Sequence, residues 1–128
     1  MAELSNYLEN ALINGTLRGT TYTAPTTTYL ALYTSDPTDA DTGTEVSGGS
    51  YTRQPITMGA PSNGASTNSA SIEFSQATAD WGIVAYVGIR DALTSGNLLY
   101  HTALDTSKTI ANGDIFKITA GNLSVTLA

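Results

Sequence analysis

The first apolar pattern in the chain is helical. Between residues 3 and 14, apolar side chains recur at spacings that place them on one face of a helix. Gly15 stands where helices commonly end in a left-handed cap. A helix of about three turns is too short to persist alone, so it must dock on its own domain or on a neighbouring subunit. The face consists of Leu4, Tyr7, Leu8, Ala11 and Leu12.

From residue 26 onward the apolar pattern changes to a period of two, which is typical of strands. Segment 28–34 is apolar on both of its faces, as expected of a strand near the centre of a sandwich. Segments of strand composition continue along the chain, separated by turn-forming pairs such as Asp36-Pro37 and Asn112-Gly113. The further predicted strands are 51–58, 69–74, 83–91, 98–103, 114–119 and 123–127.

This series of strands predicts an all-β fold. We expect an antiparallel β-sandwich, jelly-roll-like in broad terms, with a short N-terminal helix or arm. Residues 1–25 would form the arm and residues 26–128 the sandwich domain. Pro55 cannot donate a ladder hydrogen bond, so its strand is predicted to lie at a sheet edge or to contain a bulge.

The end of the chain predicts a hairpin. Residues 114–119 and 122–127 flank a two-residue turn whose second position is glycine, which is a common hairpin signal. On the first arm, Phe116 and Ile118 are expected to face the core and Lys117 the solvent.

Composition supports a sheet and limits the possible partners. The chain contains 21 Thr, 12 Ser and 12 Gly, so strand and turn formers outnumber helix formers. The formal net charge is −6 and the basic residues are scattered, so we expect neither nucleic acid nor an anionic membrane as a partner. The basic residues are Arg18, Arg53, Arg90, Lys108 and Lys117.

The sequence also limits location and stabilisation. No apolar run approaches the roughly 20 residues that cross a bilayer. The first six residues lack a basic stretch followed by an apolar one, so we expect no secretory signal and synthesis in a cytoplasm. Without cysteine there are no disulfides or thiolate metal sites, so stability depends on packing, sheet hydrogen bonds or oligomerisation.

A long polar segment, residues 35–50, interrupts the strand pattern; we call it the acidic loop. Within it, Asp39, Asp41 and Glu45 alternate with other residues around a glycine, as the oxygen ligands of a calcium site can. The spacing differs from that of an EF-hand. A solvated polar loop is the other interpretation, and loops of this length are usually functional or mobile.

The sequence gives little support for catalysis. His101 is the only histidine, and it lies in a predicted strand without a nucleophile motif. A chain of this size also offers little wall for a deep substrate cleft. We therefore expect a protein that is not an enzyme and that needs no cofactor.

Trp81 and Arg53 each invite a structural and a functional interpretation. Trp81 either covers one end of the core or serves as an exposed contact in an interface. Gly48-Gly49 permits a tight turn with positive φ into the strand that carries Tyr51 and Arg53. We predict that Arg53 pairs with a carboxylate of the acidic loop.

Several blocks occur in a distinctive order: 8–10 (LEN), 29–37 (YLALYTSDP), 44–54 (TEVSGGSYTRQ), 72–74 (IEF), 79–82 (ADWG), 87–91 (VGIRD), 96–99 (GNLL), 113–114 (GD) and 120–123 (AGNL). Together these blocks resemble a family of small tailed-phage proteins described as tail fibre or virion structural proteins. The resemblance covers nearly the whole chain. Proteins of this kind are also similar to the capsid decoration, or cement, proteins of tailed phages, including cyanobacterial phages, which form trimers or knobs on the shell.

The resemblance implies a virion structural protein made in the host cytoplasm. We expect a capsid decoration protein that stabilises the head by bridging neighbouring subunits of the major capsid protein. The alternative is a tail-fibre or baseplate accessory protein that binds a host surface glycan. In either case we expect a homo-oligomer, with a trimer favoured. The predicted contact residues are Leu4, Tyr7, Leu8, Leu12, Arg53 and Trp81.

Overall fold

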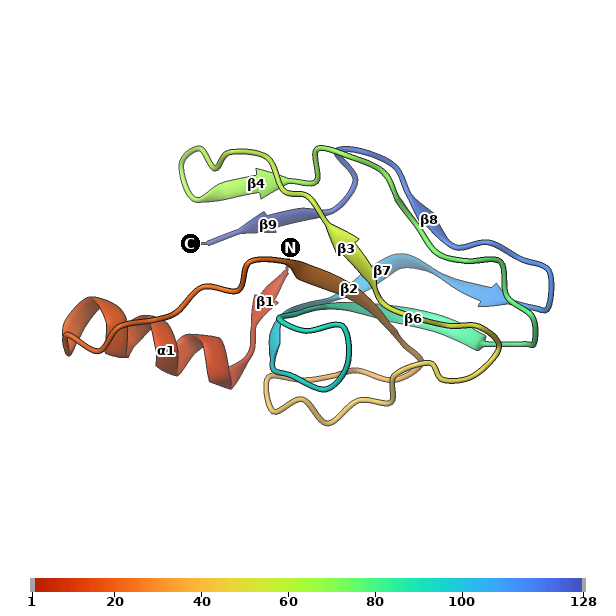
Figure 1. The fold of residues 1–128 in the computed structure, drawn as a ribbon, viewed down its shortest axis with the longest axis horizontal. Coiled ribbons are helices and arrows are strands. Elements are labelled where there is room, and N and C mark those ends of the chain that lie inside the picture. The colour runs from red at the N-terminus through yellow and green to blue at the C-terminus, as the bar shows by residue number, and fades with distance from the viewer. Residues whose placement is uncertain (1, 128) are drawn as a thin grey trace.

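The computed structural model describes residues 2–127, which form antiparallel strands and one N-terminal helix (Figure 1). The predicted all-β class with a short helix at the start is therefore confirmed. The elements are, in chain order, β1 (Glu3–Leu4), α1 (Asn6–Leu17), β2 (Thr28–Tyr33), β3 (Gln54–Ile56), β4 (Ala65–Thr67), β5 (Ile72–Glu73), β6 (Gly82–Arg90), β7 (Leu98–Ile110), β8 (Lys117–Ile118) and β9 (Ser124–Thr126).

Five strands of the described chain form the main sheet, in the order β1-β7-β6-β2-β3, and each neighbouring pair is antiparallel. β2 is an inner strand, and its last four residues are buried whichever face they point to. The prediction of a central strand is confirmed. β3 lies at the edge, where Pro55 is opposite Tyr29. An edge position tolerates a residue without an N–H, as predicted.

Two short ribbons, β4 with β9 and β5 with β8, cover one face of the main sheet. β4, β8 and β9 lie above the sheet in Figure 1. The second layer of the sandwich is thus two ribbons instead of one continuous sheet. Phe116 and Ile118 pack in the core and Lys117 is exposed, as predicted. The buried core between the layers consists of Leu30, Leu32, Val46, Ile56, Ile72, Phe74, Ala77, Trp81, Val84, Val87, Ile89, Ile110, Phe116 and Leu123.

The predicted hairpin around Ala120-Gly121 is wrong. The turn itself forms, because the Asn122 N–H donates to the Thr119 carbonyl at 3.2 Å. The strands beside it then diverge, since β8 pairs with β5 and β9 pairs with β4. The buried side chain of Asn68 takes up the backbone groups that a hairpin would pair: it donates to the Thr119 carbonyl at 3.1 Å and accepts from the Leu123 N–H at 2.9 Å.

The helix begins and ends later than predicted. Ser5 is its N-cap, and the Ser5 Oγ accepts a hydrogen bond from the Leu8 N–H at 3.2 Å. The residues predicted as the first helical turn form β1, which pairs with β7 at the edge of the main sheet. Gly15, the predicted end, lies inside α1, which continues to a C-cap at Arg18. Part of the predicted arm therefore belongs to the sheet.

β7 continues to Ile110, well past the predicted end at residue 103. Its second half pairs with the start of β6, where Ile83 lies opposite Thr109. A bulge between Val84 and Tyr86 changes the register along this pair. Residues 105–109 are polar and exposed, so no alternation of apolar side chains indicates this pairing in the sequence.

Candidate functional site

Residues 35–43 of the acidic loop lie on the face of the main sheet opposite the two ribbons, whereas Glu45 pairs with Tyr33 of β2 and Val46 belongs to the core between the layers. In Figure 1 the segment that follows β2 passes below the sheet, whereas β4 and β9 lie above it. This face of the sheet carries a small apolar cluster of Ala31, Tyr33 and Leu98, and Pro37 of the loop is also buried. The loop therefore covers the apolar cluster on this face, which the two ribbons leave uncovered.

Arg53 joins the acidic loop to the turn formed by residues 91–97. Its Nε and Nη2 donate to Oε2 and Oε1 of Glu45, both at 2.8 Å, which makes a bidentate pair. Its Nη1 donates to the carbonyls of Ala92 at 2.9 Å and Ser95 at 2.8 Å. The Arg53 side chain is 8% exposed and that of Glu45 is 24% exposed. The predicted pairing of Arg53 with a carboxylate of the acidic loop is confirmed.

Tyr51 completes this contact. Its hydroxyl donates to Glu45 Oε2 at 2.6 Å and accepts from the Leu32 N–H of β2 at 3.0 Å. Burial alone would raise the pKa of Glu45, but the hydrogen bonds from Arg53 and Tyr51 hold it below its ordinary value. Burial and the hydrogen bond to Glu45 together raise the pKa of Tyr51. The carboxyl group therefore stays ionised and the phenol stays protonated.

A second buried arginine, Arg90 at the end of β6, binds the loop at another point. Its Nη1 and Nη2 donate to the two carboxylate oxygens of Asp41 at 2.8 and 2.9 Å. The same guanidinium donates to the Tyr33 hydroxyl at 2.9 Å and to the Gly96 carbonyl at 3.0 Å. Burial alone would lower the pKa of Arg90, but the hydrogen bonds with Asp41 and Tyr33 raise it. Arg90 was not predicted as a partner of the loop.

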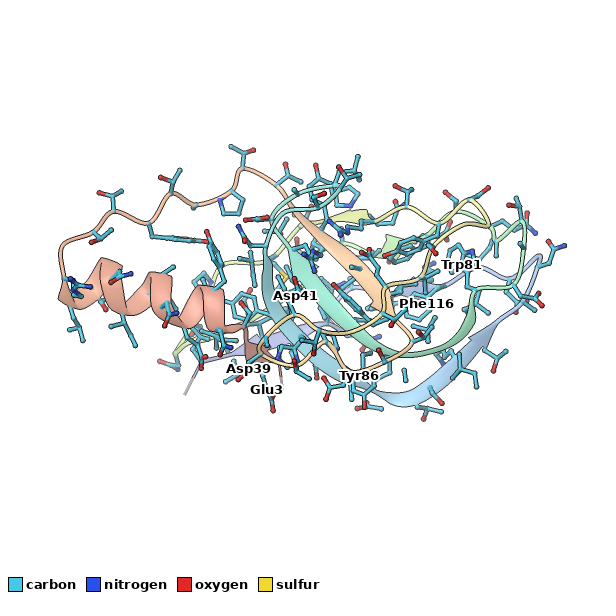
Figure 2. The ribbon with its side chains drawn as sticks, turned by 90° about the horizontal axis from the view of Figure 1, so that it is seen from below. Glu3, Asp39, Asp41, Trp81, Tyr86 and Phe116 are labelled. Carbon is cyan, nitrogen blue, oxygen red and sulfur yellow. The ribbon has the colours of Figure 1, made fainter. Side chains whose placement is uncertain are left out.

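The third contact of the loop is made by His101 of β7, whose side chain is only 5% exposed. Its Nε2 lies 2.8 Å from Asp39 Oδ1 and 3.9 Å from Glu3 Oε2. On the other side of the ring, Nδ1 lies 4.0 Å from Asp36 Oδ1. Figure 2 shows Glu3 and Asp39 beside each other near the base of the helix. One imidazole is thus surrounded by three carboxylates.

The structure does not bring Asp39, Asp41 and Glu45 together as the ligands of a calcium ion. Each of the three carboxylates faces a different basic side chain, and the guanidinium groups occupy both oxygens of Asp41 and of Glu45. Within residues 2–127 the ligand atoms that do converge belong to Glu3, Asp39 and His101. The loop carboxylates mainly attach the loop to the body of the protein.

Trp81, one of the predicted contact residues, belongs to the core. It is 5% exposed, packs edge-on against the ring of Tyr51 at a centroid distance of 5.4 Å, and donates from Nε1 to the Gly49 carbonyl at 2.9 Å. Gly49 has a φ of +57°, and a Cβ atom there would lie 2.8 Å from Trp81 Nε1. This confirms the need for glycine at this turn and the core interpretation of Trp81. Tyr51 and Arg53 were predicted to lie in the strand after the turn, but they precede it, because β3 begins at Gln54.

The remaining predicted contact residues lie on α1 or beside it. Leu8 is 3% exposed and is the buried residue of the helix. Leu4 in β1 and Leu12 are half-buried, and Tyr7 is 42% exposed. The apolar helix face that the sequence predicts therefore packs partly against the protein's own sheet.

Two other apolar residues of α1 are more exposed than any of these. Ile13 is 53% exposed and Leu17 is 79% exposed, and their spacing of four places them on one side of the helix. Neither was predicted as a contact residue, because the predicted helix ended at residue 14 and its apolar face did not include Ile13. We call residues 6–27 the helical arm; its helix extends away from the main sheet (Figure 1).

The rest of the surface offers few cations. Arg53 and Arg90 are engaged inside the protein by the acidic loop, while Arg18, Lys108 and Lys117 are exposed on separate elements. Among residues 2–127, no helix combines the length and the apolar character that a membrane crossing requires.

Comparison with known families supplies the biological context. Residues 3–126 match the family described as podophage GP4 fiber I protein gp80, a span that includes every strand and the helix described above. A search of curated proteins finds no match. The match confirms the resemblance to small virion proteins of tailed phages. The chain belongs to the podophage GP4 fiber I protein gp80 family and is a structural protein of a phage virion.

Proposed function

We propose that this protein is a subunit of a phage fibre and that the helical arm joins it to further copies of itself. The family match supports a fibre component. The observation that carries the mode of assembly is the helix, which extends from the sheet with Ile13 and Leu17 in solvent. An apolar stripe that its own domain leaves in water is stabilised when another chain buries it.

Charge favours another copy as the partner of the arm. The protein carries a net charge of −6, so two copies that met through their acidic bodies would repel each other. The helical arm has one acidic residue, Glu9, and one basic residue, Arg18, and is therefore neutral. It is the part of the surface through which like-charged copies can approach with little electrostatic cost.

Symmetry relates this contact to the expected trimer. If the arm docked on the same arm of a second copy, the contact would close as a dimer. If it docks on a different surface of the next copy, the contact repeats and forms a ring, such as a trimer, or an open filament. A trimer therefore requires the second arrangement, in which each arm is buried by its neighbour.

Sedimentation velocity of the purified chain tests the role of the arm. We expect the wild type to be an oligomer and the variant Ile13→Gln/Leu17→Gln to be a monomer with an unchanged circular dichroism spectrum, because glutamine keeps the helix but removes the apolar stripe. Leu93→Gln is the matched control, since Leu93 is an apolar residue of the 91–97 turn that is 47% exposed, close to the value for Ile13. A monomeric wild type, or a double variant that assembles like the wild type, would overturn the proposal.

The position of the protein on the particle tests the fibre role against capsid decoration, the first expectation from sequence. A cryo-EM map of the virion should show this domain in a fibre. Density on the icosahedral shell between subunits of the major capsid protein would instead support decoration and contradict the fibre role.

A further inference from the structure

The contact around His101 has the composition and geometry of a metal site. We refer to Glu3, Asp39 and His101 as the His101 site. They offer one imidazole nitrogen and two carboxylate oxygens, and these three atoms all lie within 4.8 Å of one another. The three residues come from three separate parts of the chain, namely β1, the acidic loop and β7.

The fold explains why these residues converge. Glu3 lies directly opposite His101 in the antiparallel pair β1–β7, so the two side chains project from the same face of the sheet. Asp39 is brought to them because its backbone carbonyl accepts from the Asn6 N–H at 2.8 Å. The Ser5 N–H, in turn, donates to the Leu99 carbonyl of β7 at 2.9 Å. Backbone hydrogen bonds thus hold all three segments in place independently of the side chains.

The separations fit a small divalent cation. An ion about 2.0–2.2 Å from each ligand atom in a tetrahedral arrangement requires the ligand atoms to lie about 3.3–3.6 Å apart. His101 Nε2 lies 2.8 Å from the Asp39 oxygen and 3.9 Å from the Glu3 oxygen, so the required value falls between the two. The Glu3 and Asp39 side chains are 71% and 45% exposed, and so they can make the small adjustment.

The surroundings of the imidazole also suit a bound cation. Without one, the Nε2 proton faces Asp39, because a carboxylate oxygen can only accept. With a cation on Nε2, the ring proton moves to Nδ1, where the Asp36 carboxylate lies 4.0 Å away. A carboxylate that accepts this proton is a common arrangement behind a ligating histidine, and the 53% exposed Asp36 side chain would have to move closer to do so. An open pocket of about 260 Å³, lined by Glu3, Asp36, His101 and neighbouring residues, borders the site.

We propose that Glu3, Asp39 and His101 together bind one divalent first-row transition-metal ion of the Zn²⁺ type, with solvent as a further ligand. An imidazole ligand selects this class over Ca²⁺, which takes oxygen ligands. The bound ion fastens β1 and the acidic loop to β7. Because α1 begins directly after β1, the ion also fixes the base of the helical arm. The proposal does not depend on how the arm assembles.

Calorimetric titration of the untagged full chain with ZnCl₂, after removal of metal with a chelator, tests this site. We expect one Zn²⁺ per chain, confirmed by native mass spectrometry, a rise in melting temperature with Zn²⁺, and no response to Ca²⁺. Glu3→Gln and Asp39→Asn should each weaken Zn²⁺ binding at least about tenfold. Co²⁺ in place of Zn²⁺ should give visible absorption bands that report nitrogen and oxygen ligands.

The matched control is Asp105→Asn, which removes an exposed carboxylate from the same strand as His101 and should leave Zn²⁺ binding unchanged. Both ligand variants alter exposed side chains, so their melting temperatures without metal should remain close to that of the wild type. The proposal is overturned if the wild type shows neither heat nor a melting shift with excess Zn²⁺. It is also overturned if Glu3→Gln binds as tightly as the wild type.

Discussion

Replacing Arg53 by methionine tests whether the acidic loop is held by its ion pairs. The substitution keeps an apolar stem but removes four hydrogen bonds, two to Glu45 and one each to the carbonyls of Ala92 and Ser95. Glu45 then keeps only the Tyr51 hydroxyl among the partners described above. Removing one member of a buried pair costs about 3–5 kcal/mol. Since Glu45 is 24% exposed and water can partly replace the guanidinium, we expect the lower end, about 3 kcal/mol.

Urea denaturation followed by the fluorescence of Trp81, the only tryptophan in the chain, measures this loss. With a slope of about 2 kcal/mol per molar urea, the midpoint should fall by about 1.5 M. The double-mutant cycle with Glu45→Gln isolates the pair, and we expect a coupling energy above about 1.5 kcal/mol. A coupling below about 0.5 kcal/mol would refute the reasoning, because the loop would then be held by its backbone and apolar contacts alone.

Three further predictions concern stability. The folded pKa of Glu45 lies below its ordinary value of 4.5, so the stability that its ion pair contributes is complete above about pH 4.5 and is lost as the pH falls through the folded pKa. Lowering the pH should therefore reduce the unfolding free energy of the wild type more than that of Arg53→Met. Parallel curves of unfolding free energy against pH would contradict this. Gly88→Ala places a Cβ atom 2.7 Å from Leu98 Cδ1, so the variant should lose about 1–3 kcal/mol of unfolding free energy, measured by thermal denaturation. An unchanged melting temperature would show that the side chains around Leu98 can move aside. Asn68→Ala removes three buried side-chain hydrogen bonds and should cost about 2–4 kcal/mol in urea denaturation; a loss below about 1 kcal/mol would mean that water replaces them.

Local patterns in the sequence were sufficient for most of the strands and for some special positions, but they did not predict β1 or β4 as strands. Each predicted strand segment contains or overlaps an observed strand, because alternation and β-branched composition reflect how a residue fits a half-buried sheet. The edge position of Pro55 and the positive φ of Gly49 were also predicted correctly, since the missing N–H of proline and the conformational freedom of glycine are properties of the residue itself. These features depend on neighbours in the chain and so can be seen in a short window of sequence.

Features that depend on distant partners could not be predicted in this way. Both arms beside Ala120-Gly121 look like a hairpin, yet the side chain of Asn68, far back in the chain, takes up the backbone groups near the turn. Leu4 fits an apolar helical face and a short edge strand equally well, and only the pairing with β7 decides between them. The loop carboxylates looked like one ligand set, but each is drawn to a different basic side chain on the sheet.

The pairing of early strands with late ones has a consequence for how the chain is made. β1 pairs with β7, and the ribbons form only when β8 and β9 reach β5 and β4. While the ribosome still holds the last third of the chain, the inner strand β2 and the edge strand β3 have no completed layer above them. The apolar residues of these strands stay exposed to water until then. Strands that are far apart in the sequence pair slowly. The sandwich therefore cannot close until the segments that carry β8 and β9 have left the ribosome.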